Sequence, residues 1–136
     1  MSARADRELI DAARHAQRRA YAPYSRFRVG AALRARSGAI YEGCNVENAS
    51  YGVTLCAERV ALATMVAGGE LGWTHIVIAS DADPPAPPCG TCLQMLVEFA
   101  DDGAVVLAGD SGVRTLTLRE LLPNPFVLRS LDGGER

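Results

Sequence analysis

Apolar residues near the start of the chain recur at the spacing of a helix. The positions that share one face are Leu9, Ile10, Ala13, Ala16 and Ala20. This pattern predicts an amphipathic helix over residues 4–20. Pro23 ends it, because the proline ring disfavours helical backbone in the residue before it.

The rest of the chain alternates between short apolar runs and helical patterns. The predicted strands cover residues 27–36, 39–46, 73–80, 104–108 and 114–118, the first two joined by the turn Ser37-Gly38. The predicted helices cover residues 55–67 and 89–100, with a last helical turn over 119–122. Residues 47–54 are polar and irregular, and the four prolines within 81–88 require a loop. Strands alternating with helices predict a layered α/β fold with a mixed sheet.

Length and composition narrow the class of protein. A chain of 136 residues fits one domain, residues 1–136, whose tail after about residue 130 is expected to fray. The net charge of -2 and the scattered arginines give no basic stripe, which is weak evidence against a nucleic-acid polymer as partner. No apolar run is long enough for a membrane span, and the polar start is unlike a secretory signal. We therefore expect a cytoplasmic protein, in which four cysteines indicate metal or redox chemistry.

Two short segments carry the candidate chemistry, Cys56-Ala57-Glu58-Arg59 and Pro88-Cys89-Gly90-Thr91-Cys92. Cys89 and Cys92 face the same side of one helical turn, and Cys56 also lies at the start of a helix, where the partial positive charge favours thiolates. If the two helix ends are neighbours, three thiolates converge on one zinc ion and leave a position open for water. Glu58 would stand beside that position as the proton shuttle, which is the arrangement known for zinc deaminases.

The chain resembles the small, homo-oligomeric cytidine deaminases from Tyr21 to Phe126. The matching stretches are Tyr24-Ser25-Arg26-Phe27 with Val29-Gly30-Ala31-Ala32, Gly43-Cys44-Asn45-Val46-Glu47-Asn48, Cys56-Ala57-Glu58-Arg59, Pro88-Cys89-Gly90-Thr91-Cys92, and Glu120-Leu121-Leu122-Pro123 followed by Phe126. The resemblance implies a three-layer α/β/α fold with a mixed five-stranded sheet. It also implies one Zn²⁺ per chain and a homotetramer whose sites are shared between subunits.

The same resemblance implies roles for the residues around the nucleoside. Asn45 and Glu47 would bind ribose hydroxyls, the backbone of Ala57 would contact the base, and Phe27 would pack beside the pyrimidine. Phe126 would reach into a neighbouring subunit's site, and Tyr51 is assigned to the substrate site as well. The family also places an arginine, here Arg59, against the zinc thiolates. The expected reaction is hydrolytic deamination of cytidine, 2'-deoxycytidine or both, with attack of water at C4 and Glu58 moving the protons.

One departure from the family and several alternatives stay open. The family has an arginine directly after the last cysteine, where this chain has Leu93, which puts local helix packing or subunit contacts in doubt. Cys89 and Cys92 alone also suit a thioredoxin-like redox pair, and a structural zinc would recruit Cys44. Other members of the proposed site have structural alternatives: loop capping for Asn45 and Glu47, core packing for Phe27 and Phe126, and a solvated helix position for Glu58 and Arg59. Within the deaminases, the substrate could instead be a modified cytosine nucleoside or a cytosine-nucleoside antibiotic.

Overall fold

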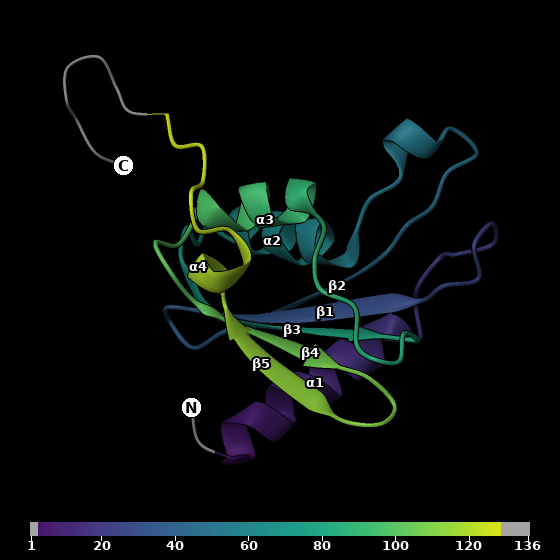
Figure 1. Ribbon diagram of the computed structural model, residues 1–136, viewed down its shortest axis with the longest axis horizontal. Helices are drawn as coiled ribbons and strands as arrows, with labels where there is room; N and C mark the ends of the chain where they lie inside the picture. Colours follow the sequence, from purple (N-terminus) through teal and green to yellow (C-terminus); the bar gives the residue numbers. More distant parts are fainter. Residues whose placement is uncertain (1–2, 129–136) are drawn as a thin grey trace.

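A computed structural model describes residues 3–128 of the chain and shows three layers (Figure 1). The middle layer is a five-stranded sheet in the order β2-β1-β3-β4-β5, in which β3 and β4 are parallel and the other neighbours antiparallel. Its strands are β1 (Val29–Ala35), β2 (Ile40–Cys44), β3 (Trp73–Ser80), β4 (Ala104–Ala108) and β5 (Val113–Thr117). The helices are α1 (Ala3–Gln17) on one face of the sheet, and α2 (Ala57–Ala67), α3 (Gly90–Val97) and the short α4 (Leu118–Leu121) on the other. This confirms the predicted mixed sheet and the α/β/α layers.

The buried side chains of the strands point alternately to the two faces of the sheet, so the core has two parts. On β1, Ala31, Leu33 and Ala35 face α2 and α3, whereas Ala32 faces α1. Successive side chains of a strand point to opposite faces, so this one strand supplies both cores. The larger core, between the sheet and α2 and α3, contains the fully buried Trp73.

Two glycines let helices approach the sheet closely. A Cβ added at Gly30 would lie 2.1 Å from the carbonyl oxygen of Ala13 in α1. A Cβ added at Gly43 would lie 2.3 Å from the backbone nitrogen of Ala61 in α2. Each helix therefore rests directly on a strand backbone, and the position of α2 is set by its contact with β2.

The order of the elements is as predicted, with shifts at their ends. The first strand begins at Val29 rather than Phe27, because side chains take the backbone N–H groups just before it: the Ser25 hydroxyl accepts from Phe27 and Asp81 accepts from Arg28. The first helix ends at Gln17, three residues early, and the loop over 47–54 contains a 3₁₀ turn, Tyr51–Val53, that the sequence pattern did not predict. The expected fraying after about residue 130 lies outside the described residues.

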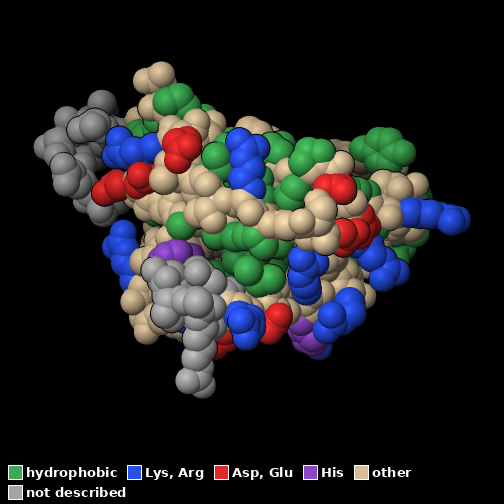
Figure 2. Space-filling model, turned by 60° about the horizontal axis from the view of Figure 1, so that its bottom comes forward, with side chains coloured by type: hydrophobic (Ala, Val, Ile, Leu, Met, Phe, Trp, Pro, Cys, Tyr) green, Lys and Arg blue, Asp and Glu red, His purple; other side chains and the backbone are tan. Residues whose placement is uncertain are grey.

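The α1 face of the sheet is only partly covered. Beside α1, a groove of about 390 Å³ is lined mainly by apolar residues of β3, β4 and β5, and Figure 2 shows apolar side chains gathered on this side of the molecule. This groove lies across the sheet from α2 and α3. Within residues 3–128, no helix is long and apolar enough to cross a bilayer.

Candidate active site

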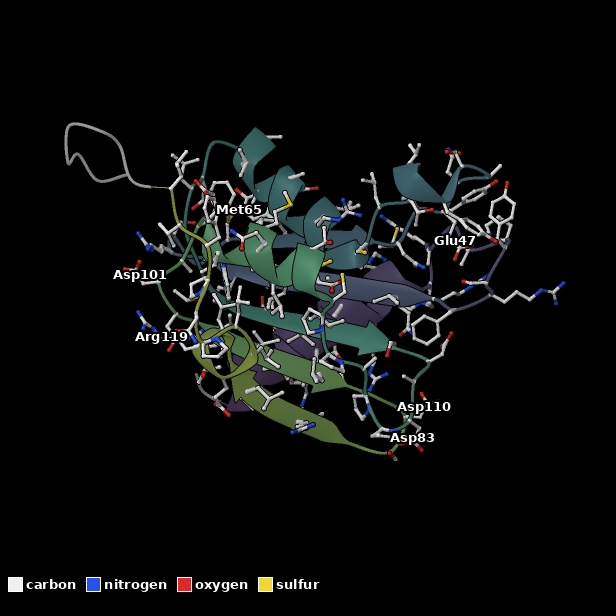
Figure 3. All side chains as sticks on the ribbon, turned by 45° about the horizontal axis from the view of Figure 1, so that its top comes forward. Glu47, Met65, Asp83, Asp101, Asp110 and Arg119 are labelled. Carbon is white, nitrogen blue, oxygen red and sulfur yellow. The ribbon has the colours of Figure 1, made fainter. Side chains whose placement is uncertain are left out.

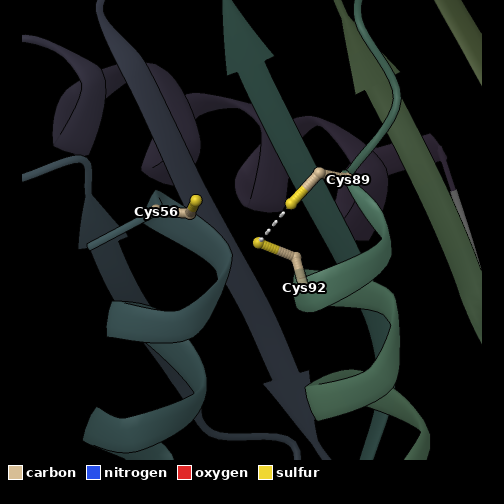
Figure 4. A group of neighbouring side chains, drawn as sticks. All are labelled: Cys56, Cys89 and Cys92. Atoms are coloured by element: carbon tan, nitrogen blue, oxygen red, sulfur yellow. Dashed lines mark hydrogen bonds between the residues drawn. The ribbon is translucent and has the colours of Figure 1, made fainter. Parts of the chain in front are cut away.

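Three cysteine sulfurs meet between the first turns of α2 and α3 (Figure 4). Cys56 is the residue that precedes α2 and Cys89 the one that precedes α3, while Cys92 lies in the first turn of α3. Their Sγ atoms all lie within 4.8 Å of one another, and those of Cys89 and Cys92 are 3.7 Å apart. Neither Cys56 nor Cys89 uses its side chain to cap its helix, so both sulfurs remain available to a ligand.

The spacing of these sulfurs fits zinc. Tetrahedral zinc with Zn–S bonds of about 2.3 Å holds its sulfurs about 3.8 Å apart, close to the separation between Cys89 and Cys92. Cys44, at the end of β2, does not belong to the cluster, so the described residues supply three sulfur ligands and not four. Three protein ligands are the number found in catalytic zinc sites. The arrangement therefore favours a catalytic metal over the structural alternative.

The charge state of the cluster is compatible with a bound cation. The hydrogen bond with Cys92, assisted by the Arg59 guanidinium, lowers the pKa of the Cys56 thiol to about 5. The same contact, together with burial, raises the pKa of the Cys92 thiol far above its usual value. One sulfur thus ionises at the expense of its neighbour, because two negative charges this close repel each other. A divalent cation between them allows the sulfurs to ionise together.

Arg59 lies against this cluster rather than in solvent. Its Nη2 atom is 3.8 Å from Cys56 Sγ and donates to the carbonyl oxygen of Thr54 at 2.9 Å. Its Nε atom is buried and has no hydrogen-bond partner among the described residues. The positive charge is therefore held next to the sulfurs, as the family resemblance implies, and Thr54 links it to the neighbouring loop.

Glu58 is the buried carboxyl group at the start of α2. Its residue is 6% exposed, which is far from the solvated position that a first-turn glutamate usually has. Burial raises the pKa of this carboxyl group above its ordinary value, and the negative charge of Cys56 acts in the same direction. A carboxyl group with a raised pKa exchanges protons closer to neutral pH, which suits acid–base work. Ala57, directly before it, is fully buried.

Asn45, which directly follows β2, connects the end of that strand to the start of β1. Its side-chain oxygen accepts from the N–H of Val29 at 3.0 Å, and its amide nitrogen donates to the carbonyl oxygen of Phe27 at 2.8 Å. An amide can accept two hydrogen bonds and donate two, so one of each remains for a ligand. Asn45 thus has the structural role that the sequence left open as an alternative, and it still has the capacity to bind a hydroxyl.

Glu47 organises the turn before β1 in a similar way. Its carboxylate accepts from the backbone N–H groups of Tyr24 at 3.0 Å and Ser25 at 3.1 Å, and also from the Ser25 hydroxyl. The Ser25 hydroxyl is the largest cause that holds the pKa of Glu47 below its ordinary value. In Figure 3, Glu47 lies on the right of the molecule, away from Asp101 and Arg119 on the left.

A small open pocket adjoins this carboxylate. It has a volume of about 240 Å³ and is lined by Tyr24, Ser25, Glu47, Tyr51 and Thr54. The predicted substrate residues Glu47 and Tyr51 are therefore brought together, and Thr54 connects them to Arg59. Ser25 and Thr54 were not predicted as site residues, although Ser25 belongs to one of the stretches that carry the family resemblance.

The three aromatic residues predicted to contact substrate lie in two different parts of the molecule. Phe27 and Tyr51 are 38% and 78% exposed at the loop end of the sheet. Phe126 is 71% exposed and its backbone is bound by α3, so it does not belong to the core of its own chain. Leu93, at the position where the family resemblance implies an arginine, is buried in the core under α3. This turn of α3 is therefore anchored by apolar packing.

Comparisons with known proteins agree with this geometry. Residues 3–108 match the family model described as the cytidine and deoxycytidylate deaminase zinc-binding region. A cytidine deaminase of Halalkalibacterium halodurans is 41% identical over 126 residues, which cover 91% of this chain and 96% of that protein. The crystal structure of cytidine deaminase from Burkholderia pseudomallei superimposes with a TM-score of 0.86 at 42% identity, over 93% of this chain and 100% of that one. A more distant relative, a blasticidin-S deaminase of Bacillus cereus, is 29% identical over 103 residues, 70% of this chain and 74% of that protein.

A three-sulfur cluster beside a buried glutamate, at the starts of two helices on one face of a mixed sheet, defines a zinc-dependent deaminase of the cytidine type. The chain belongs to the cytidine and deoxycytidylate deaminase family. A thioredoxin-like redox pair is not supported, because that chemistry has no use for Cys56 or Glu58.

Proposed function

We propose that this protein hydrolyses the 4-amino group of cytidine, 2'-deoxycytidine or both, giving the uracil nucleoside and ammonia. The observation that carries the proposal is the convergence of the Cys56, Cys89 and Cys92 sulfurs beside the buried carboxyl group of Glu58. We assign the three sulfurs as ligands of one Zn²⁺ and Glu58 as the catalytic acid and base outside the metal shell. We also propose that the whole chain forms a single domain of this type.

The zinc ion and Glu58 have separate roles in the proposed reaction. Zinc, when bound, supplies a Lewis acid that brings the pKa of water at the site close to neutrality. Glu58 accepts a proton from the water that adds to C4 of the pyrimidine and returns a proton to N3. It then transfers the second proton of the water to the amino group, which leaves as ammonia. Burial favours these transfers, because the raised pKa of Glu58 lowers the cost of its protonated form.

The sugar subsite favours a nucleoside over a free base or a nucleotide. Asn45 keeps one donor and one acceptor free, and the Glu47 carboxylate borders the pocket. A site built to bind hydroxyl groups rejects a ligand that lacks them, because its own polar groups then stay unpaired. The pocket lining includes no arginine, and Glu47 would repel a phosphate. Deoxycytidine keeps the 3'-hydroxyl, so this geometry does not separate it from cytidine.

We further propose that the protein works as a homotetramer with shared sites. Support comes from apolar side chains left exposed in two places. At the loop end they are Tyr21, Tyr24, Phe27, Tyr51, Val53 and Leu55, and on the C-terminal segment there is Phe126. Apolar side chains gathered on the surface of a single chain commonly mark an interface. Phe126 is the residue best placed to enter another copy, because it projects from its own chain while its backbone is held.

The test is an ultraviolet assay over a panel of cytosine compounds, with the assembly measured by light scattering. We expect efficient turnover of cytidine or deoxycytidine, very slow turnover of free cytosine and poor turnover of the 5'-monophosphate. Comparable rates on cytosine and cytidine would refute the sugar subsite, and preference for an antibiotic or modified nucleoside would redirect the substrate assignment. A monomer with full activity would refute the shared sites.

A further inference from the structure

The C-terminal part of the described chain runs past α3 as an extended segment, residues 122–128, here called the strap. It follows α4 and rises along the side of α3 in Figure 1. The side-chain amide of Gln94 in α3 donates to the carbonyl oxygen of Phe126 at 2.8 Å. A bond between positions 32 residues apart in the sequence fixes the strap to this helix.

The bond holds the backbone of Phe126 while leaving its ring outside. The residue is 71% exposed, and its neighbour Leu128 is 73% exposed. A ring exposed to water in this way contributes no hydrophobic stabilisation to its own chain. A ring held in place in advance, however, loses less conformational entropy when it enters a partner's site.

The helix that carries the strap bond also carries Cys92 and directly follows Cys89. Gln94 follows Cys92 by two residues, and α3 extends only from Gly90 to Val97. Leu93 between them is buried and anchors this turn of the helix in the core. Phe126 is therefore held at a fixed position relative to one sulfur cluster while its ring projects away from the chain.

We propose that Gln94 is a positioning residue that presents Phe126 to the nucleoside site of a neighbouring copy of this chain. The inference rests on the proposed function, because it takes the neighbour's nucleoside site as the place where the ring acts. Gln94 acts through Phe126 and does not touch the substrate. Its loss should therefore weaken nucleoside binding and leave the chemical step intact.

The main test is Gln94→Glu, which keeps the size of the side chain but replaces the donor with a carboxylate facing a carbonyl oxygen. Hydrogen bonds of this kind correspond to roughly 2- to 10-fold in an equilibrium, so we expect KM for the nucleoside to rise by about that factor. kcat, zinc content and the midpoint of thermal unfolding should stay at the wild-type values. Gln94→Lys, which restores an N–H donor, should recover part of the loss.

Asn124→Asp is the matched control, because it makes the same change from amide to acid at an exposed strap position and leaves the Gln94 donor in place. It should leave KM unchanged. A double-mutant cycle with Phe126→Ala then tests the route of the effect. If Gln94 acts through Phe126, the double variant should show the KM of Phe126→Ala alone; additive effects would overturn the proposal.

A second measurement does not depend on activity. Chymotrypsin cleaves after Phe126, and a released strap should be cut several-fold faster in Gln94→Glu than in the wild type or Asn124→Asp, with the site read by mass spectrometry. Unchanged cleavage would overturn the proposal, and so would faster cleavage with an unchanged KM. If the wild type deaminates no cytosine nucleoside, the proposed function fails, and the presentation of Phe126 to a nucleoside site fails with it. The cleavage rates then still show whether Gln94 holds the strap.

Discussion

The contact of β2 with α2 at Gly43 offers a way to move one sulfur without changing any site residue. In Gly43→Ala, the new Cβ would lie 2.3 Å from the backbone nitrogen of Ala61 and 2.6 Å from the carbonyl oxygen of Ala57. Ordinary contacts of this kind begin at 3.4 Å, so α2 must retreat by about 1 Å or the strand must yield by as much. Both contacts are to backbone, so no side-chain rotation can relieve them.

A shift of α2 changes the site because Cys56 directly precedes this helix and Glu58 lies in its first turn. Cys89 and Cys92 instead lie at the start of α3. Metal–ligand distances tolerate about 0.2 Å, and a displacement of about 1 Å at a catalytic group can cost about 100-fold in rate. We therefore expect a lower zinc content and a fall in kcat/KM of about two orders of magnitude. Overpacking of this kind costs about 1–3 kcal/mol, which should lower the midpoint of thermal unfolding by several degrees.

The assay measures zinc per chain, the thermal midpoint and kcat/KM on cytidine in three proteins. Gly112→Ala is the control, because a Cβ there meets nothing within 4 Å and the backbone is not in the left-handed region. It should keep full zinc and activity and be as stable as the wild type or slightly more so. The reasoning is refuted if Gly43→Ala matches Gly112→Ala in zinc content and kcat/KM.

Three further predictions concern individual site residues. Glu58→Gln should keep one zinc per chain and the fold yet lose about 10²- to 10⁴-fold in turnover, since a general acid–base group contributes about that much; loss of the zinc would make Glu58 a ligand. Arg59→Gln removes a positive charge 3.8 Å from Cys56 Sγ and should move the acidic limb of the kcat/KM profile to higher pH at matched zinc content; an unchanged limb would place Arg59 outside the catalytic electrostatics. Ser25→Ala should raise the pKa of Glu47, because the Ser25 hydroxyl is the main cause of its lowered value. The ionised form of Glu47 is then lost at a higher pH as the solution is acidified, so KM should begin to climb at a higher pH than in the wild type, and identical KM profiles would contradict this.

The periodicity of the chain determined the sequence of elements. Alternation and apolar runs located all five strands, and the glycines and prolines located the breaks between elements. The spacing of Cys89 and Cys92 placed two sulfurs on one helical turn by local geometry alone. The Cys-x-Glu segment and the second cysteine pair resemble the arrangement known for zinc deaminases, so the sequence alone indicated this chemistry through the resemblance.

Only the tertiary structure decided how distant groups meet. The approach of Cys56 to the α3 cysteines depends on two helices packed side by side on the sheet, and α2 rests on Gly43, a contact that no local pattern predicts. The first strand begins only at Val29 because the side chain of Asp81, remote in sequence, takes the N–H group of Arg28 that a longer strand ladder would have used. Propensity and periodicity describe neighbours along the chain, whereas these contacts are chosen by packing and by the need to pair each backbone donor with an acceptor.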